Sequence, residues 1–169
     1  MTTTRPAAQT KTRTRGLSPR VFYRTVSIAE AITWTLLIVG MLLKYAAGLG
    51  SLPVLIAGSL HGLVFITYAA TSVLVGVNQR WRVPRIVLAV VMAIIPYATI
   101  PFDVRMDRTG ALEGDWHREP TDDPRDQRWE RRVLRWFLRR PAVLITVFVL
   151  AVLVIMTVLL VIGPPGGWS

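Results

Sequence analysis

Four ionisable side chains, Glu30, Lys44, His61 and Asp103, lie inside or beside long apolar stretches of this chain. A carboxylate and an imidazole at membrane depth can take up and release protons, so each is a candidate functional site. His61 is the deepest of them, since residues 45–79 contain no Asp, Glu, Lys or Arg. The chemistry to test first is therefore proton handling within a membrane.

His61 has three interpretations. It is a structural histidine that hydrogen-bonds across a helix interface, a proton-handling or ligand-binding group, or a metal or haem ligand. The last needs further ligands, and the only other histidine, His117, lies in a polar loop with Glu113, Asp115 and Glu119. Because that loop lacks a second anchored set of ligands, we expect no metal and no cofactor.

Glu30 shares a helix face with Trp34 and Lys44. Fourteen residues of helix separate Glu30 from Lys44 by about 21 Å, so the two cannot pair with each other. Glu30 either pairs with Arg24 or another interfacial arginine, or it faces the interior of the bundle. Lys44 is expected to reach the membrane edge.

Composition indicates the fold class. The 169 residues are 52% hydrophobic and form four long apolar runs, which predicts an all-α, polytopic integral membrane protein with four transmembrane helices. The absence of cysteine excludes disulfides and thiolate metal sites. The net charge of +10 favours topology signals and anionic lipid headgroups over nucleic acid as its explanation.

The predicted organisation has six parts. A disordered basic tail over 1–20 precedes a three-helix membrane domain over 21–105, and a polar loop, an amphipathic helix, a fourth span and a tail follow at 106–123, 124–140, 141–163 and 164–169. The spans of the membrane domain are predicted at about 25–43, 53–77 and 86–102.

Small residues form a stripe on the second span. Gly58 and Gly62 make a small-xxx-small pattern, which lets two helices approach closely in lipid. We expect helix packing along this stripe, whose members are Gly58, Gly62, Ala69, Ser72 and Gly76.

The third span is interrupted by Pro96 and Pro101. A kink there frees backbone carbonyls beside Tyr97, which either line a cavity or serve packing alone. Because Asp103 and Lys44 both flank the membrane on one side in a four-span arrangement, we expect them to form an ion pair.

Arginine and tryptophan mark two interfacial segments. Trp81, between Arg80 and Arg82, is predicted to be an interface anchor. The helix over 124–140 should begin at Asp123-Pro124 and lie on anionic headgroups, with docking to a partner protein as the alternative. Its lipid-interface residues are predicted to be Trp129, Arg132, Trp136, Arg139 and Arg140.

Charge does not decide the topology of four spans. With the N-terminus inside, the inner side carries nine basic residues, six in the tail and three in the second loop. The outer side carries eleven, Lys44 and ten arginines of residues 103–140, so the two sides are nearly equal. If the third span instead enters and leaves on one side, nineteen basic residues lie inside and one outside. That distribution fits the charge better, but 17 residues with two prolines is short for a re-entrant helix pair. In either arrangement we expect a cytoplasmic N-terminus.

Residues from about Arg24 to Arg108 resemble the bacterial integral-membrane HG-domain family, a domain of unknown function. The resemblance implies a three-helix membrane domain found largely in Gram-positive bacteria, especially actinobacteria, and it implies no activity. Residues 109–169 are an addition to that form. The matching features are Glu30, Leu43-Lys44-Tyr45, His61-Gly62 and the segment Pro96-Tyr97-Ala98-Thr99-Ile100-Pro101-Phe102-Asp103.

We expect a small non-enzymatic protein of the cell membrane, an accessory or scaffold subunit with a membrane-protein partner or a second copy of itself. The alternative is a small oligomeric transporter or proton-coupled permeation unit that uses Glu30 and His61. A membrane enzyme is the third possibility, but no nucleophile is paired with a base at a recognisable spacing.

Overall fold

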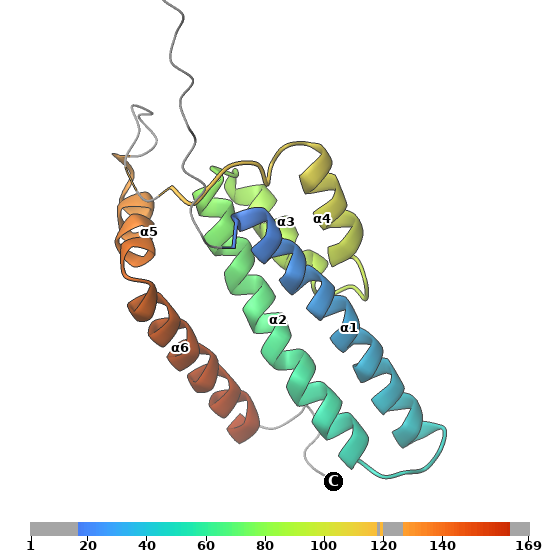
Figure 1. Cartoon of the computed structure of the whole chain (residues 1–169). Helices are drawn as coiled ribbons and strands as arrows, with labels where there is room; N and C mark the ends of the chain where they lie inside the picture. The colour runs from blue at the N-terminus through green and yellow to red at the C-terminus, as the bar shows by residue number, and fades with distance from the viewer. Residues whose placement is uncertain (1–16, 118, 120–126, 163–169) are drawn as a thin grey trace, which may run out of the picture.

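The structure is a computed structural model that describes residues 17–117, 119 and 127–162. The described residues form α-helices joined by turns and loops, as the sequence predicts (Figure 1). Three of them, α1, α2 and α6, are long and apolar enough to cross a membrane, where the sequence predicted four. The helices are α1 (Pro19–Tyr45), α2 (Leu52–Asn78), α3 (Val83–Met92), α4 (Thr99–Arg108), α5 (Trp129–Arg139) and α6 (Pro141–Ile162).

Helices α1 and α2 form an antiparallel hairpin that is the frame of the molecule (Figure 1). The Ser18 hydroxyl caps α1 by accepting a 3.3 Å hydrogen bond from the backbone N–H of Val21, and Pro19 occupies the first turn. The predicted disorder of 1–20 is therefore wrong for its last two residues, and residues 1–16 lie outside the described part. Gly48 and Gly50 have φ of +67° and +75° in the connecting loop, which suits glycine.

Helices α1 and α2 approach each other closely at Gly40, which the sequence reasoning missed. A Cβ atom there would lie 3.0 Å from the Pro53 carbonyl oxygen and 3.2 Å from the Ala57 Cβ. By contrast, a Cβ at Gly58 would lie 3.8 Å from Leu37, and one at Gly62 would lie 3.8 Å from the Met156 sulfur in α6. Alanine would therefore fit at either position, and the contacts of α2 with α1 and α6 in the described chain do not need glycine at 58 or 62.

The predicted third span over 86–102 is two short helices that turn back on each other. Helix α3 ends at Met92, turns occupy residues 93–98, and α4 starts at Thr99 beside the N-terminal half of α1 (Figure 1). Ten helical residues span about 15 Å, half of a hydrocarbon core of about 30 Å. Pro96 ends the helical ladder, and Tyr97 turns the chain with φ of +63°. We call this element the α3–α4 hairpin.

An aromatic core holds the α3–α4 hairpin to the frame. The Trp81 ring lies 5.7 Å from the Tyr23 ring and 6.5 Å from the Phe102 ring. Trp81 is only 7% exposed, and its indole N–H donates a 2.8 Å hydrogen bond to the Ala111 carbonyl. The prediction that Trp81 anchors the chain at the lipid interface is therefore wrong.

Helices α5 and α6 pack loosely on the outside of α2 (Figure 1). Leu134 and Leu138 are the buried residues of α5. Helix α5 begins at Trp129 instead of residue 124, and the predicted start at Asp123-Pro124 lies outside the described residues. Most described side chains of α6 are exposed, which suits a helix that faces lipid. The predicted tail over 164–169 is likewise not among the described residues.

Candidate functional site

Glu30 and His61 meet in the interior, between α1 and α2. Nδ1 of His61 lies 3.9 Å from a Glu30 carboxylate oxygen, and the Glu30 side chain is fully buried. The sequence indicated no base within reach of His61, and the structure supplies one from the neighbouring helix. Of the two positions considered for Glu30, the interior one is observed. Both Glu30 oxygens lack a hydrogen-bond partner among the described residues.

Thr33 sets the orientation of the imidazole. Its hydroxyl donates to the Glu30 backbone carbonyl at 3.0 Å and lies 3.1 Å from His61 Nδ1. Since a hydroxyl has one hydrogen, Nδ1 is the donor in the second contact when the hydroxyl donates to that carbonyl, and the acceptor in the other tautomer. Carboxylate and hydroxyl thus approach the same ring nitrogen, whereas a hydrolytic triad places them on opposite nitrogens. The arrangement suits proton storage better than activation of a nucleophile.

Trp34 connects this pair to the tip of the α3–α4 hairpin. Its ring lies 4.5 Å from the His61 ring, and its indole N–H donates a 3.0 Å hydrogen bond to the Ala93 carbonyl. The hydroxyls of Thr35, one residue further along α1, and of Tyr97 in the turn are 3.2 Å apart. These two contacts tie the turn between α3 and α4 to α1 near His61. The Tyr97 side chain, which makes one of them, is 44% exposed.

Buried polar groups form a column along the N-terminal half of α1. The Tyr23 and Tyr68 hydroxyls are 2.7 Å apart, and the Thr99 hydroxyl donates to the Ser27 carbonyl at 3.3 Å. From Tyr23 to Thr33 the column covers about 15 Å. Beyond it the two helices close at Gly40. The buried polar members are Tyr23, Ser27, Glu30, Thr33, Tyr68, Ser72 and Thr99.

The column begins at a cluster of charges that joins α1 to α4. Nε of Arg24 donates a 3.0 Å hydrogen bond to Asp103, and Nη2 of Arg20 donates a 2.7 Å hydrogen bond to Asp107. The Arg20 guanidinium holds the pKa of Asp107 below its ordinary value. The predicted Lys44–Asp103 pair is wrong, because Lys44 lies about 30 Å along α1 from Arg24 and stacks 5.0 Å above the Tyr45 ring.

The remaining residues of the predicted packing stripe differ in their roles. A Cβ at Gly76 would lie 2.7 Å from Ile86, so glycine is needed there for α3 to pass. Ser72 is fully buried and Ala69 is half-buried. All five predicted lipid-interface residues lie on or next to α5 and are exposed: Trp129, Arg132, Trp136, Arg139 and Arg140.

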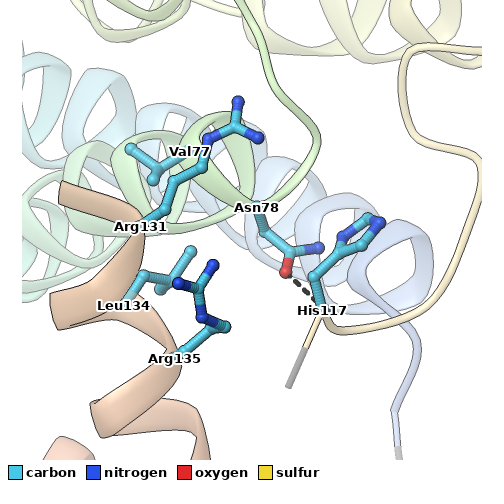
Figure 2. Close-up of a pocket in the computed structure, with 6 residues that line it drawn as sticks. All are labelled: Val77, Asn78, His117, Arg131, Leu134 and Arg135. Carbon is cyan, nitrogen blue, oxygen red and sulfur yellow. Dashed lines mark hydrogen bonds between the residues drawn. The ribbon is translucent and has the colours of Figure 1, made fainter. Parts of the chain in front are cut away.

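A small pocket lies where α5 meets the end of α2. Leu134 and Arg135 of α5 and Val77 of α2 line it, and the Asn78 amide oxygen accepts a 2.9 Å hydrogen bond from the backbone N–H of His117 (Figure 2). Its volume of about 10 Å³ has room for one water at most. Within the described residues, no three His, Cys, Asp or Glu side chains are grouped to hold a metal.

Comparison with known proteins agrees with this architecture. A protein of Streptomyces coelicolor, an actinobacterium, that is named "Putative membrane protein" is 41% identical over 100 residues, which cover 59% of this chain and 11% of that protein. The chain thus matches about a tenth of the relative's length. No solved structure matches. The family model described as "Domain of unknown function (DUF3817)" matches residues 21–108. Because that match covers more than half of the 169 residues, the chain belongs to this family.

Proposed function

We propose that this chain is a non-enzymatic accessory or scaffold module of a larger membrane complex. The observation that carries the proposal is that the segment matched in the Streptomyces coelicolor protein makes up only 11% of that protein's length. A domain that occurs within a much longer membrane protein is suited to work beside other membrane segments. The outer face of α6, which includes Ile145, Val149 and Leu153, offers an apolar surface for such a neighbour.

Site-specific photo-crosslinking in native membranes tests this proposal. A crosslinking amino acid at Val149, which is 46% exposed, is expected to capture a distinct membrane protein in stoichiometric amounts. The matched control is the same amino acid at Met156, which faces Gly62 of α2 and should crosslink within the chain. Lipid adducts alone at Val149, with elution of the protein as a monomer, would reject an accessory role.

We also propose the topology: the N-terminus, α5 and both ends of the α3–α4 hairpin lie on the cytoplasmic side of the cell membrane. With a hairpin that enters and leaves on one side, all basic residues of the chain except Lys44 belong to cytoplasmic segments. That distribution is far more asymmetric than the one that four full crossings allow.

Cysteine labelling distinguishes the two topologies, since the natural chain has no cysteine. In intact cells, an impermeant maleimide should label Ser51→Cys in the α1–α2 loop. It should label Thr109→Cys, beyond α4, only after permeabilisation. Labelling of both variants in intact cells would mean that the hairpin crosses the membrane.

A second function is favoured by one specific observation, the buried Glu30 carboxylate 3.9 Å from His61. We propose, as the alternative, an oligomeric proton-coupled unit in which this pair exchanges a proton. The polar column leads from the charged end of the bundle to His61, while the far half of α1 and α2 is closed at Gly40. A second copy of the chain must then complete the path.

Proton flux into liposomes tests this alternative. Glu30→Gln and His61→Gln are expected to abolish the flux while preserving thermal stability, and Thr35→Val, on the same helix, is the control. Equal flux in the two site variants and the wild-type protein would exclude the pair as a proton station.

A further inference from the structure

A basic groove on α5 has the composition of an anion site. Its lining residues are spaced at i, i+3, i+4 and i+7, so they lie on one face of the helix. Among the residues that the structure describes, the groove is lined by three guanidinium groups and one indole, from Arg132, Arg135, Trp136 and Arg139. We refer to these four residues as the α5 groove.

Charge around the α5 groove is strongly positive. Residues 128–140 contain six arginines and one acid, Glu130. The Glu130 carboxylate lies 3.9 Å from Arg128, so its charge is directed to the start of the helix. A guanidinium group binds phosphate with two parallel N–H···O hydrogen bonds, and several of them on one face can hold a dianionic ligand.

Trp136 and Arg140 place the α5 groove at the border of the membrane. The Trp136 ring is 46% exposed and lies 5.2 Å from the Arg140 guanidinium. The next residue, Pro141, begins the membrane-spanning helix α6. An exposed tryptophan beside arginines at the start of a span is typical of the headgroup level of a bilayer.

Exposed apolar side chains that suit acyl chains follow the α5 groove along the chain. Val147 and Leu150 of α6 are 46% and 55% exposed. A ligand that joins phosphate to long apolar chains can therefore contact the groove and α6 together. A soluble phosphate compound would use only the first of these surfaces.

From this juxtaposition we propose that the α5 groove is a binding site for the headgroup of an anionic phospholipid, with preference for one that carries two phosphates, such as cardiolipin. The phosphates bind Arg132, Arg135 and Arg139, the Trp136 ring lies at the glycerol level, and the acyl chains follow α6. On this basis α5 ties the last span to one class of lipid as well as to the membrane surface.

Native mass spectrometry of the full chain, released from nanodiscs that contain equal amounts of cardiolipin, phosphatidylglycerol and phosphatidylcholine, tests the site. We expect cardiolipin to remain bound most often, and Arg132→Gln with Arg139→Gln to lower its retention about tenfold, since each removed surface charge weakens binding several-fold. The control is Arg82→Gln with Arg85→Gln, which removes two exposed charges elsewhere and should leave retention unchanged. Thermal unfolding verifies that each variant folds.

Three results would overturn the proposal: equal loss of cardiolipin in the control, equal retention of all three lipids by the wild-type protein, and displacement of cardiolipin by the same concentration of glycerol phosphate. The last would mean a soluble-phosphate site. Arg132→Lys with Arg139→Lys keeps the charge and removes the paired hydrogen bonds, so an intermediate retention is expected. Full retention in this variant would reject guanidinium–phosphate pairing.

Discussion

Asp103 of α4 accepts a 3.0 Å hydrogen bond from Nε of Arg24, one turn inside the N-terminal end of α1. The Asp103 side chain is 4% exposed, whereas that of Arg24 is 42% exposed. The contact therefore covers a buried carboxylate with a cation that stays in touch with water. The contact holds α4 at the charged end of the helix bundle.

Removal of the Arg24 charge should destabilise the protein. Arg24→Gln leaves Asp103 buried without its cation, so we expect a loss of about 2 kcal/mol in the free energy of unfolding. Arg20→Gln is the matched control and should cost less, because Arg20 is 51% exposed. Unfolding in detergent measures both, and Asp103→Asn should recover part of the loss in the Arg24→Gln background. No recovery in the double variant would mean that the two residues act independently.

The Asp107 carboxylate should make stability depend on pH in the acid range. Arg20 hydrogen-bonds Asp107 and lowers its pKa in the folded protein below the ordinary value of 3.8. A depressed acid pKa contributes stability above the unfolded pKa, and that stability is lost as the pH falls through the folded pKa. The difference in melting temperature between the wild-type protein and Asp107→Asn should thus be constant from about pH 7 to 5 and shrink below about pH 4. A difference that persists to pH 3 would refute this linkage.

Gly40 and Gly62 should respond differently to the same substitution. Gly40→Ala places a Cβ 3.0 Å from the Pro53 carbonyl oxygen, so α1 and α2 must separate. Overpacking of this kind costs about 1–3 kcal/mol. Gly62→Ala adds an ordinary contact with Met156 and should be tolerated. Melting temperatures of the two variants check the prediction, and a larger loss at Gly62 would restore the close-packing role expected from its sequence pattern.

Trp34→Phe should loosen the tip of the α3–α4 hairpin. The change removes the indole N–H that hydrogen-bonds the Ala93 carbonyl and costs about 1 kcal/mol. Hydrogen exchange should rise in residues 93–98. In the control, Trp81→Phe, which breaks the bond to Ala111, it should rise in the loop after α4. If exchange rises equally in both regions in each variant, the two indoles do not act locally.

The helix content and the family could be predicted from the sequence, and the number of crossings could not. Apolar length predicts α1 and α2 well because each is a continuous apolar helix. The segment 86–102 has the composition of a short span, but Pro96 and the positive φ of Tyr97 reverse the chain. The distribution of basic residues favoured a segment that enters and leaves on one side of the membrane, whereas its length of 17 residues argued against a re-entrant pair.

Only half of the candidate site was visible in the sequence. Glu30 and His61 were recognised separately, because ionisable residues are rare in apolar runs. Their contact depends on the register between α1 and α2, which is set by the close approach at Gly40 and by loop geometry. The Arg24–Asp103 pair was missed for a different reason: a full third crossing would carry Asp103 to the opposite side of the bilayer.

The indole of Trp34 also limits the order in which the chain can assemble. The hairpin that it holds is too short to enter a bilayer as a span, and carbonyls freed at its turn are costly in lipid until a donor is present. For Ala93 that donor belongs to α1. In the one-sided topology proposed above, we therefore expect α1 and α2 to insert first and the hairpin to dock on them afterwards. Biogenesis of this domain would then be sequential, with hairpin docking as its last step.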